Sequence, residues 1–135
     1  MSGTLPGRPP RRTEETGPFW DGCAEGRLVL PRCTACAEWI WYPRRFCPFF
    51  GSLSVEWGAV SGLGTVYTFT IMRRGSGAYK ESAPYVVAYV ELREGPRLLT
   101  NIVTDDPDAV YVGQPVRVLF QPVGDTDALF RFEPA

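Results

Sequence analysis

Five segments rich in β-branched and aromatic residues fill the second half of the chain and limit its fold more than any other feature. They cover residues 64–71, 84–92, 96–103, 115–121 and 128–132. Such residues favour extended backbone, and turn signals such as Arg93-Glu94-Gly95-Pro96 separate the segments. We therefore predict five β-strands, with a short helix or turn at residues 106–110 between the third strand and the fourth.

Five strands with a helical insert after the third suit a small closed barrel of the OB type. A β-sandwich remains the alternative, because the number of strands does not fix closure. The chain has 135 residues, of which 44% are hydrophobic. That is enough to bury an apolar core without a metal or disulfide bonds, so the predicted fold class is mainly β.

Cysteine spacing marks the region before the strands. Cys33-Thr-Ala-Cys36 forms a Cys-x-x-Cys pair, whereas Cys47-Pro-Phe-Phe50 has phenylalanine where a second pair would end. Strand-like segments at residues 27–30 and 38–42 flank the first pair, which is the layout of a zinc ribbon. A redox role is disfavoured, because redox pairs normally open a helix and this pair lies between two predicted strands.

Structural zinc takes four ligands, and this ribbon supplies only Cys33, Cys36 and Cys47. We expect it to have lost its metal and to persist as a hydrophobic minidomain. The side chains predicted to fill it are Trp39, Trp41, Phe46, Phe49 and Phe50. Zinc held by the three thiolates is the alternative, with Cys23, from a helix predicted at residues 19–26, as a candidate fourth ligand.

Composition excludes several classes of function. The chain has no histidine, which rules out an imidazole base, and its net charge of −1 gives no general attraction to nucleic acid or anionic lipid. No apolar run approaches the roughly 18 residues needed to cross a bilayer. Residues 1–18 contain seven Pro or Gly, so we expect a disordered tail or a segment that orders only on a partner. These features favour a cytoplasmic protein.

Several motifs in order resemble the DUF35 family. They are the Phe19-Trp20 helix, the Cys-x-x-Cys ribbon, Gly-x-Gly-Thr-Val-Tyr-Thr-Phe-Thr at 62–70, Ala-Pro-Tyr-Val-Val-Ala at 83–88 and Val-Gly-Gln-Pro-Val at 112–116. The resemblance implies a rubredoxin-like zinc ribbon followed by an OB-fold domain. We accordingly expect a tail at 1–18, a helix plus degenerate ribbon at 19–54 and the OB-fold domain at 55–135.

The resemblance also implies a partner role. Members of the family assemble with thiolase-superfamily enzymes, whose subunit carries the catalytic residues, while the DUF35 subunit supplies interface and helps hold the CoA ester. We therefore expect a non-catalytic accessory subunit in a hetero-oligomer, with no catalytic residues of its own. The expected reaction is retro-aldol cleavage in steroid side-chain degradation, and a thiolase-type acyltransferase or condensing complex is the alternative.

Two groups of site residues follow. Nine of the eighteen aromatic residues lie between 19 and 57, and we expect a partner interface at Phe19, Trp20, Trp39 and Trp41. The loop between the first two barrel strands carries three cations, and with the adjoining tyrosine it is a candidate CoA site: Arg73, Arg74, Lys80 and Tyr85. A solvated loop tip explains the same cations.

Binding of single-stranded nucleic acid is the competing class of function. It would need stacking aromatic side chains on the barrel, for which the candidates are Tyr67, Phe69, Tyr85 and Tyr89. Aromatic residues with period two more often belong to a core, and the chain lacks the basic excess that such binding needs. We therefore expect no nucleic-acid partner.

Overall fold

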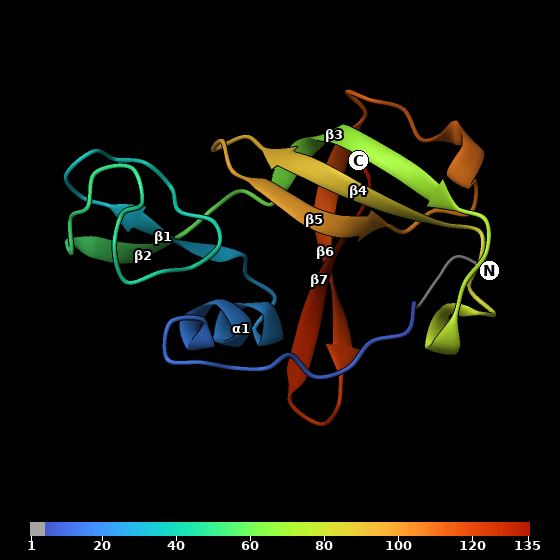
Figure 1. Ribbon diagram of the computed structural model, residues 1–135, viewed down its shortest axis with the longest axis horizontal. Coiled ribbons are helices and arrows are strands. Elements are labelled where there is room, and N and C mark those ends of the chain that lie inside the picture. Colours follow the sequence, from blue (N-terminus) through green and yellow to red (C-terminus); the bar gives the residue numbers. More distant parts are fainter. Residues whose placement is uncertain (1–4) are drawn as a thin grey trace.

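The computed structural model describes residues 5–135 and is mainly β. An α-helix, α1 (Gly17–Ala24), precedes a two-stranded sheet of β1 (Val29–Cys33) and β2 (Val55–Ala59). A separate barrel follows (Figure 1). Within the described residues, no helix has both the length and the apolar character required to cross a membrane.

The barrel closes in the order β3-β4-β5-β7-β6, which confirms the predicted OB-type barrel and not the sandwich. Its strands are β3 (Leu63–Met72), β4 (Tyr85–Leu92), β5 (Arg97–Ile102), β6 (Pro115–Val123) and β7 (Asp127–Pro134). All neighbouring pairs are antiparallel except β5 and β7, which pair in parallel through Ile102 and Phe132. Two short 3-10 helices, η1 (Gly77–Tyr79) and η2 (Pro107–Ala109), lie in the connections, and η2 fits the insert predicted at 106–110.

The barrel core follows from alternation along the strands. Val86, Ala88 and Val90 of β4 are buried, whereas the residues between them are more exposed, as period-two side chains require. At the centre Phe132 is fully buried. Helix α1 covers one end of the barrel through Phe19, because that side chain enters the same core.

The ribbon differs from the prediction in its second strand. Strand β1 pairs with β2, from Val29 opposite Ala59 to Cys33 opposite Val55. Residues 38–42 form only one bridge, between Trp39 and Arg32, so the predicted strand there is wrong. Two backbone hydrogen bonds, Cys33 N–H to Glu38 O and Ile40 N–H to Pro31 O, hold residues 38–40 beside β1. Beyond them Trp41 packs against Phe19 of α1, with ring centroids 5.1 Å apart. Residues 55–59, which the prediction placed in the OB-fold domain, pair with the ribbon strand.

The N-terminal segment also differs from the prediction. Residues 5–12, called the strap below, cross β6 and β7 and lead to α1 (dark blue in Figure 1). The carbonyl of Leu5 accepts a hydrogen bond from Gln121 Nε2 at 2.5 Å, and Arg12 pairs with Asp127 at 2.5 Å. We expected residues 5–18 to be disordered, whereas the structure places the strap on the barrel, where barrel side chains bind it. Residues 1–4, also assigned to the tail, lie outside the described residues.

Candidate functional site

The first cysteine turn is a knuckle held by backbone hydrogen bonds. The amide of Cys33 donates to the carbonyl of Glu38 at 2.9 Å, and the amide of Ala37 donates to the carbonyl of Cys33 at 2.8 Å. Ala37 adopts a φ of 66°, a left-handed conformation that is uncommon outside glycine. This turn places the sulfurs of Cys33 and Cys36 in the same cluster.

The second turn has the same backbone arrangement although it lacks a cysteine. The amide of Cys47 donates to the carbonyl of Ser52 at 2.9 Å, and that of Gly51 donates to the carbonyl of Cys47 at 2.7 Å. Gly51 has a φ of 75°, matching Ala37 of the first knuckle. Phe50 therefore occupies the position that Cys36 holds in the first turn, and the loss of the fourth thiolate has left the turn itself intact.

The three remaining thiols form a compact cluster. The sulfurs of Cys33, Cys36 and Cys47 all lie within 4.8 Å of one another, and those of Cys36 and Cys47 are 3.5 Å apart. Zinc–sulfur bonds of about 2.3 Å in a tetrahedron place sulfurs about 3.8 Å apart, so these spacings suit one metal ion. Backbone amides, chiefly that of Cys36, donate to the Cys33 sulfur and lower the pKa of this thiol, which favours the ligating thiolate.

These three thiolates fit zinc, with a fourth ligand from outside the cluster. Bound there, a zinc ion would supply structural cross-linking of the two turns. Cys23 is not that ligand: it is 1% exposed within the core shared by α1 and the barrel, and it does not belong to the thiol cluster. Burial raises the pKa of Cys23 to about 12, so its thiol remains protonated at neutral pH.

The aromatic filling predicted for the ribbon is wrong for its second half. Phe46, Phe49 and Phe50 are 44%, 70% and 66% exposed, and Leu53 beside them is 81% exposed. We call these four residues the ribbon tip. Trp39 and Trp41 are partly buried, but they pack against the barrel core and not inside the ribbon. The interior of the ribbon is instead the thiol cluster with Ile40.

The proposed interface residues are mostly internal contacts. Phe19 is fully buried, and its ring packs edge-on against Trp20 at 4.8 Å and Phe130 at 5.5 Å. Phe19 is therefore not available to a partner, which corrects that assignment. Trp20 is half-buried, and Trp39 and Trp41 are partly covered by the barrel. Sequence reasoning missed the exposed ribbon tip because aromatic side chains are usually buried. The one available signal was phenylalanine in place of cysteine at position 50.

The four residues predicted to bind CoA have different surroundings. Arg73 Nη2 lies 2.6 Å from Asp108 Oδ1 and lowers the pKa of that carboxyl by hydrogen bonding and charge. Arg74 and Lys80 are exposed on the loop. Tyr85 instead packs against Tyr79, with centroids 5.0 Å apart, and lines a cavity together with Arg131.

The predicted stacking residues lie partly on the outside of the barrel. Tyr67 and Tyr89 are 46% and 44% exposed, so the interpretation of these two side chains as core is wrong. The guanidinium of Arg97 lies 3.9 Å from the centroid of the Tyr67 ring. Phe69 is half-buried against the core, so it does not extend this outer surface.

Comparison with known families agrees with this architecture. Residues 20–56 match the rubredoxin-like zinc ribbon domain of ChsH2, and residues 57–121 match the C-terminal OB-fold domain of ChsH2. A DUF35 domain-containing scaffold protein of Methanothermobacter thermautotrophicus is 32% identical over 114 residues, covering 79% of this chain and 86% of that protein. The chain belongs to the DUF35 family.

Two further relatives are informative. A solved structure titled "Ltp2-ChsH2(DUF35) aldolase" superposes with a TM-score of 0.82 at 33% identity, covering 93% of this chain and 98% of that one. The 3-oxo-4,17-pregnadiene-20-carboxyl-CoA hydratase alpha subunit of Mycobacterium tuberculosis is 30% identical over 135 residues, covering 93% of this chain. The chain spans only 39% of that hydratase subunit's length.

Proposed function

We propose that this chain is a cytoplasmic, non-catalytic accessory subunit of an acyl-CoA enzyme, and that its partner is a thiolase-like protein. The observation that carries the proposal is the 33% identity, over 93% of the chain, to the DUF35 protein of an aldolase complex. The proposed reaction is retro-aldol cleavage of a steroid side-chain CoA ester, supported by the relative named for a pregnadiene-carboxyl-CoA. A thiolase-type acyltransferase complex is the alternative reaction.

The ribbon tip is the proposed contact with the partner. Its four apolar side chains are exposed together on a segment of eight residues, 46–53, which is unusual for a surface that stays in water. Phenylalanines in such a cluster commonly form the buried centre of an interface. Trp39 and Trp41 flank this surface, since both they and Phe49 line one groove of about 300 Å³ between ribbon and barrel.

The test is co-expression of the tagged chain with its genomic neighbours, followed by pull-down and mass spectrometry. We expect recovery of a thiolase-like protein, and at least about tenfold weaker association after Phe49→Ala combined with Leu53→Ala. Tyr111→Ala is the matched control, because Tyr111 is a 55% exposed aromatic residue outside the ribbon. Recovery of no thiolase-like protein would contradict the accessory role, whereas recovery with equal binding by both variants would contradict only the ribbon-tip contact.

Contact with the CoA ester is the second part of the proposal. Arg74 and Lys80 are exposed cations for which the described residues form no ion pair, so they remain open to a phosphate. Arg73 would have to exchange Asp108 for the ligand. Replacement of Arg74 and Lys80 by alanine should weaken acyl-CoA binding by the complex. Unchanged affinity would remove the loop from the site.

A second candidate function, binding of single-stranded nucleic acid, has one observation in its favour. Tyr67 and Tyr89 are exposed on the barrel, and the cation of Arg97 lies over the Tyr67 ring, as a stacking surface requires. Fluorescence titration with oligothymidylate distinguishes the two functions. Binding that is lost in Tyr67→Ala would support this candidate, and absence of binding would eliminate it.

A further inference from the structure

Arg131 of β7 is a buried cation with neutral partners. Its side chain is buried, and the residue is only 7% exposed. Nε donates to Gln121 Oε1 at 3.3 Å, Nη1 donates to Asn101 Oδ1, and Nη2 donates to the carbonyl of Pro6 at 2.7 Å. Asn101 is fixed in turn, because its amide donates to the carbonyl of Val86 at 2.9 Å. The guanidinium is therefore held in one orientation by a prepared set of acceptors.

No carboxylate balances this charge within the part of the chain that the structure describes. None of the ion pairs among residues 5–135 involves Arg131, and residues 1–4 contain no acidic side chain. An isolated buried charge is unfavourable unless it is paired, so such an arginine suits an anion from outside the chain. A guanidinium matches carboxylate and phosphate oxygens in particular, because its planar N–H groups bind them in pairs.

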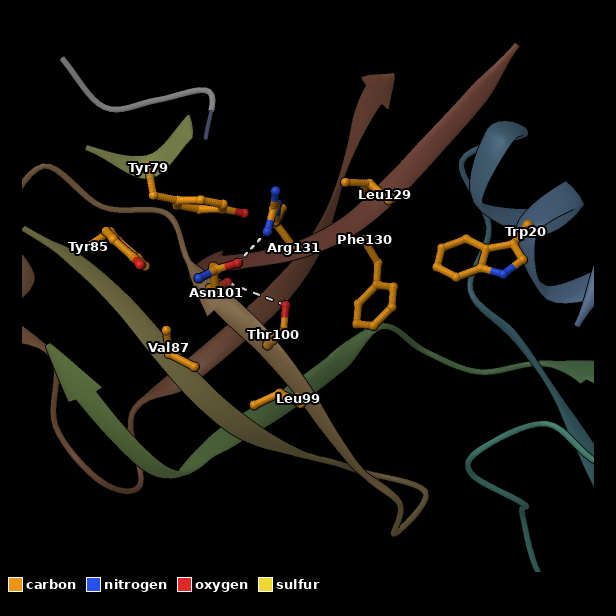
Figure 2. A pocket seen from close by; sticks show the side chains of 10 residues that line it. All are labelled: Trp20, Tyr79, Tyr85, Val87, Leu99, Thr100, Asn101, Leu129, Phe130 and Arg131. Atoms are coloured by element: carbon orange, nitrogen blue, oxygen red, sulfur yellow. Dashed lines mark hydrogen bonds between the residues drawn. The ribbon is translucent and has the colours of Figure 1, made fainter. Parts of the chain in front are cut away.

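The cavity beside Arg131 has a volume of about 370 Å³ and mostly apolar walls. Figure 2 shows Tyr79 and Tyr85 on one side of Arg131 and Asn101, and Phe130 with Trp20 on the other. A cavity with aromatic walls and one fixed cation suits a flat apolar group that carries an oxyanion.

The strap supplies the acceptor that such an anion would replace. The carbonyl of Pro6 accepts both from Arg131 and from Tyr79 Oη, at 2.7 and 3.0 Å. Gly7 lies so close to the barrel that a Cβ there would be 2.6 Å from Leu129 Cδ1. We propose that this cavity binds a small organic anion, a carboxylate or phosphate on a flat apolar group, with Arg131 as the anchor and the strap as a displaceable cover of its guanidinium. The proposal is independent of the partner enzyme.

Isothermal titration with benzoate, phenyl phosphate and inorganic phosphate tests the site. The full-length chain is compared with a variant lacking residues 1–8, which retains Arg12 and its ion pair with Asp127. We expect an aromatic anion to bind, and to bind at least about tenfold more tightly when the cover is absent. The stronger of the two aromatic probes identifies carboxylate or phosphate as the preferred group, while inorganic phosphate measures the contribution of the anion alone.

Arg131→Met separates the anchor from the walls. It should weaken binding of the aromatic anion at least about tenfold, both in the full-length chain and in the variant lacking residues 1–8. Such a loss is typical of a charge-assisted hydrogen bond. Arg117→Met is the matched control, because Arg117 lies on β6, is exposed and pairs with Glu133. Arg131→Lys, which keeps the positive charge but loses the planar set of N–H donors, should also weaken binding and serves if Arg131→Met does not fold. Equal affinities of the Arg131 and Arg117 variants, or no binding of any probe by the folded strap-deleted chain, would overturn the proposal.

Discussion

The barrel and the ribbon achieve a defined fold in different ways. The barrel encloses large side chains, among them Phe132, Leu98 and Ile102, inside a closed ladder of strands. The ribbon has only two paired strands, and its buried centre consists of two cysteines and Ile40. Apolar burial is sufficient for the first region. The second has a cluster of three thiols at its centre, so metal and local sequence changes should affect it far more than they affect the barrel.

The largest effect is expected in the barrel core. Phe132→Ala should lower the free energy of unfolding by about 3 to 5 kcal/mol, because it leaves a cavity at the centre of the barrel. Urea unfolding monitored by circular dichroism measures this loss. Phe49→Ala is the control from the ribbon tip, and its effect should stay within about 0.5 kcal/mol. Comparable losses in both variants would mean that the tip also packs against the chain.

Restoring the fourth thiolate should strengthen the ribbon without affecting the barrel. Phe50→Cys places a cysteine on a turn whose hydrogen bonds already match those of the first knuckle. Zinc affinity should rise by roughly 100-fold or more, since a complete set of four ligands replaces three. Competition with a chelator gives the affinity, and the visible spectrum of the cobalt form reports the number of thiolates.

Phe49→Cys is the matched control for this substitution. It adds the same thiol one position earlier, on a side chain that is equally exposed but does not correspond to Cys36. If both variants bound zinc equally well, the equivalence of the two turns would be wrong.

The cysteines of the two regions should differ in reactivity. In the metal-free chain at pH 8, iodoacetamide should modify the partly exposed Cys36 before Cys23, because burial raises the pKa of Cys23 to about 12. Peptide mass spectrometry gives the order. A thiol with a raised pKa stabilises the fold fully below its ordinary value near 9, so this contribution should decline as pH rises from about 9 towards 12. Cys23→Ala should remove that dependence.

The smallest expected effect is on the barrel surface. Arg73→Ala should raise the pKa of Asp108 towards its ordinary value, because the pKa is lowered by the hydrogen bond and charge of Arg73. The Arg73–Asp108 pair stabilises the fold at pH values above the ordinary pKa of an aspartate. This stabilisation is lost as pH falls through the lowered pKa of Asp108. An NMR titration of the Asp108 carboxyl measures the shift. No shift in the variant would show that the two exposed side chains do not pair in solution.

Local patterns predicted the barrel better than the ribbon. The five barrel strands were predictable because β-branched and aromatic residues recur between clear turn signals. The second ribbon strand was not, because β1 has neighbours on both edges: residues 55–59 pair along its whole length, whereas residues 38–42 form one bridge. The strap had no signal in its own residues, since its hydrogen-bond donors lie more than 70 positions away.

The candidate sites divide in the same way. Cysteine spacing was sufficient to place Cys33, Cys36 and Cys47 together, because a knuckle is a local structure. The burial of Phe19 and the exposure of Phe49 and Phe50 depend on which surfaces the tertiary fold brings into contact. Arg131 was not singled out because a lone arginine in a strand gives no sign that it will be buried among neutral acceptors.

The matching backbones of the two ribbon turns have a consequence for how this site can evolve. Codons for phenylalanine and cysteine differ only at the second base, so a point mutation converts position 50 from one residue to the other. Because Gly51 and the hydrogen bonds of its turn suit either side chain, no second substitution has to come first. A four-thiolate ribbon and an apolar surface patch are therefore neighbouring genotypes, and a lineage can pass between them in either direction.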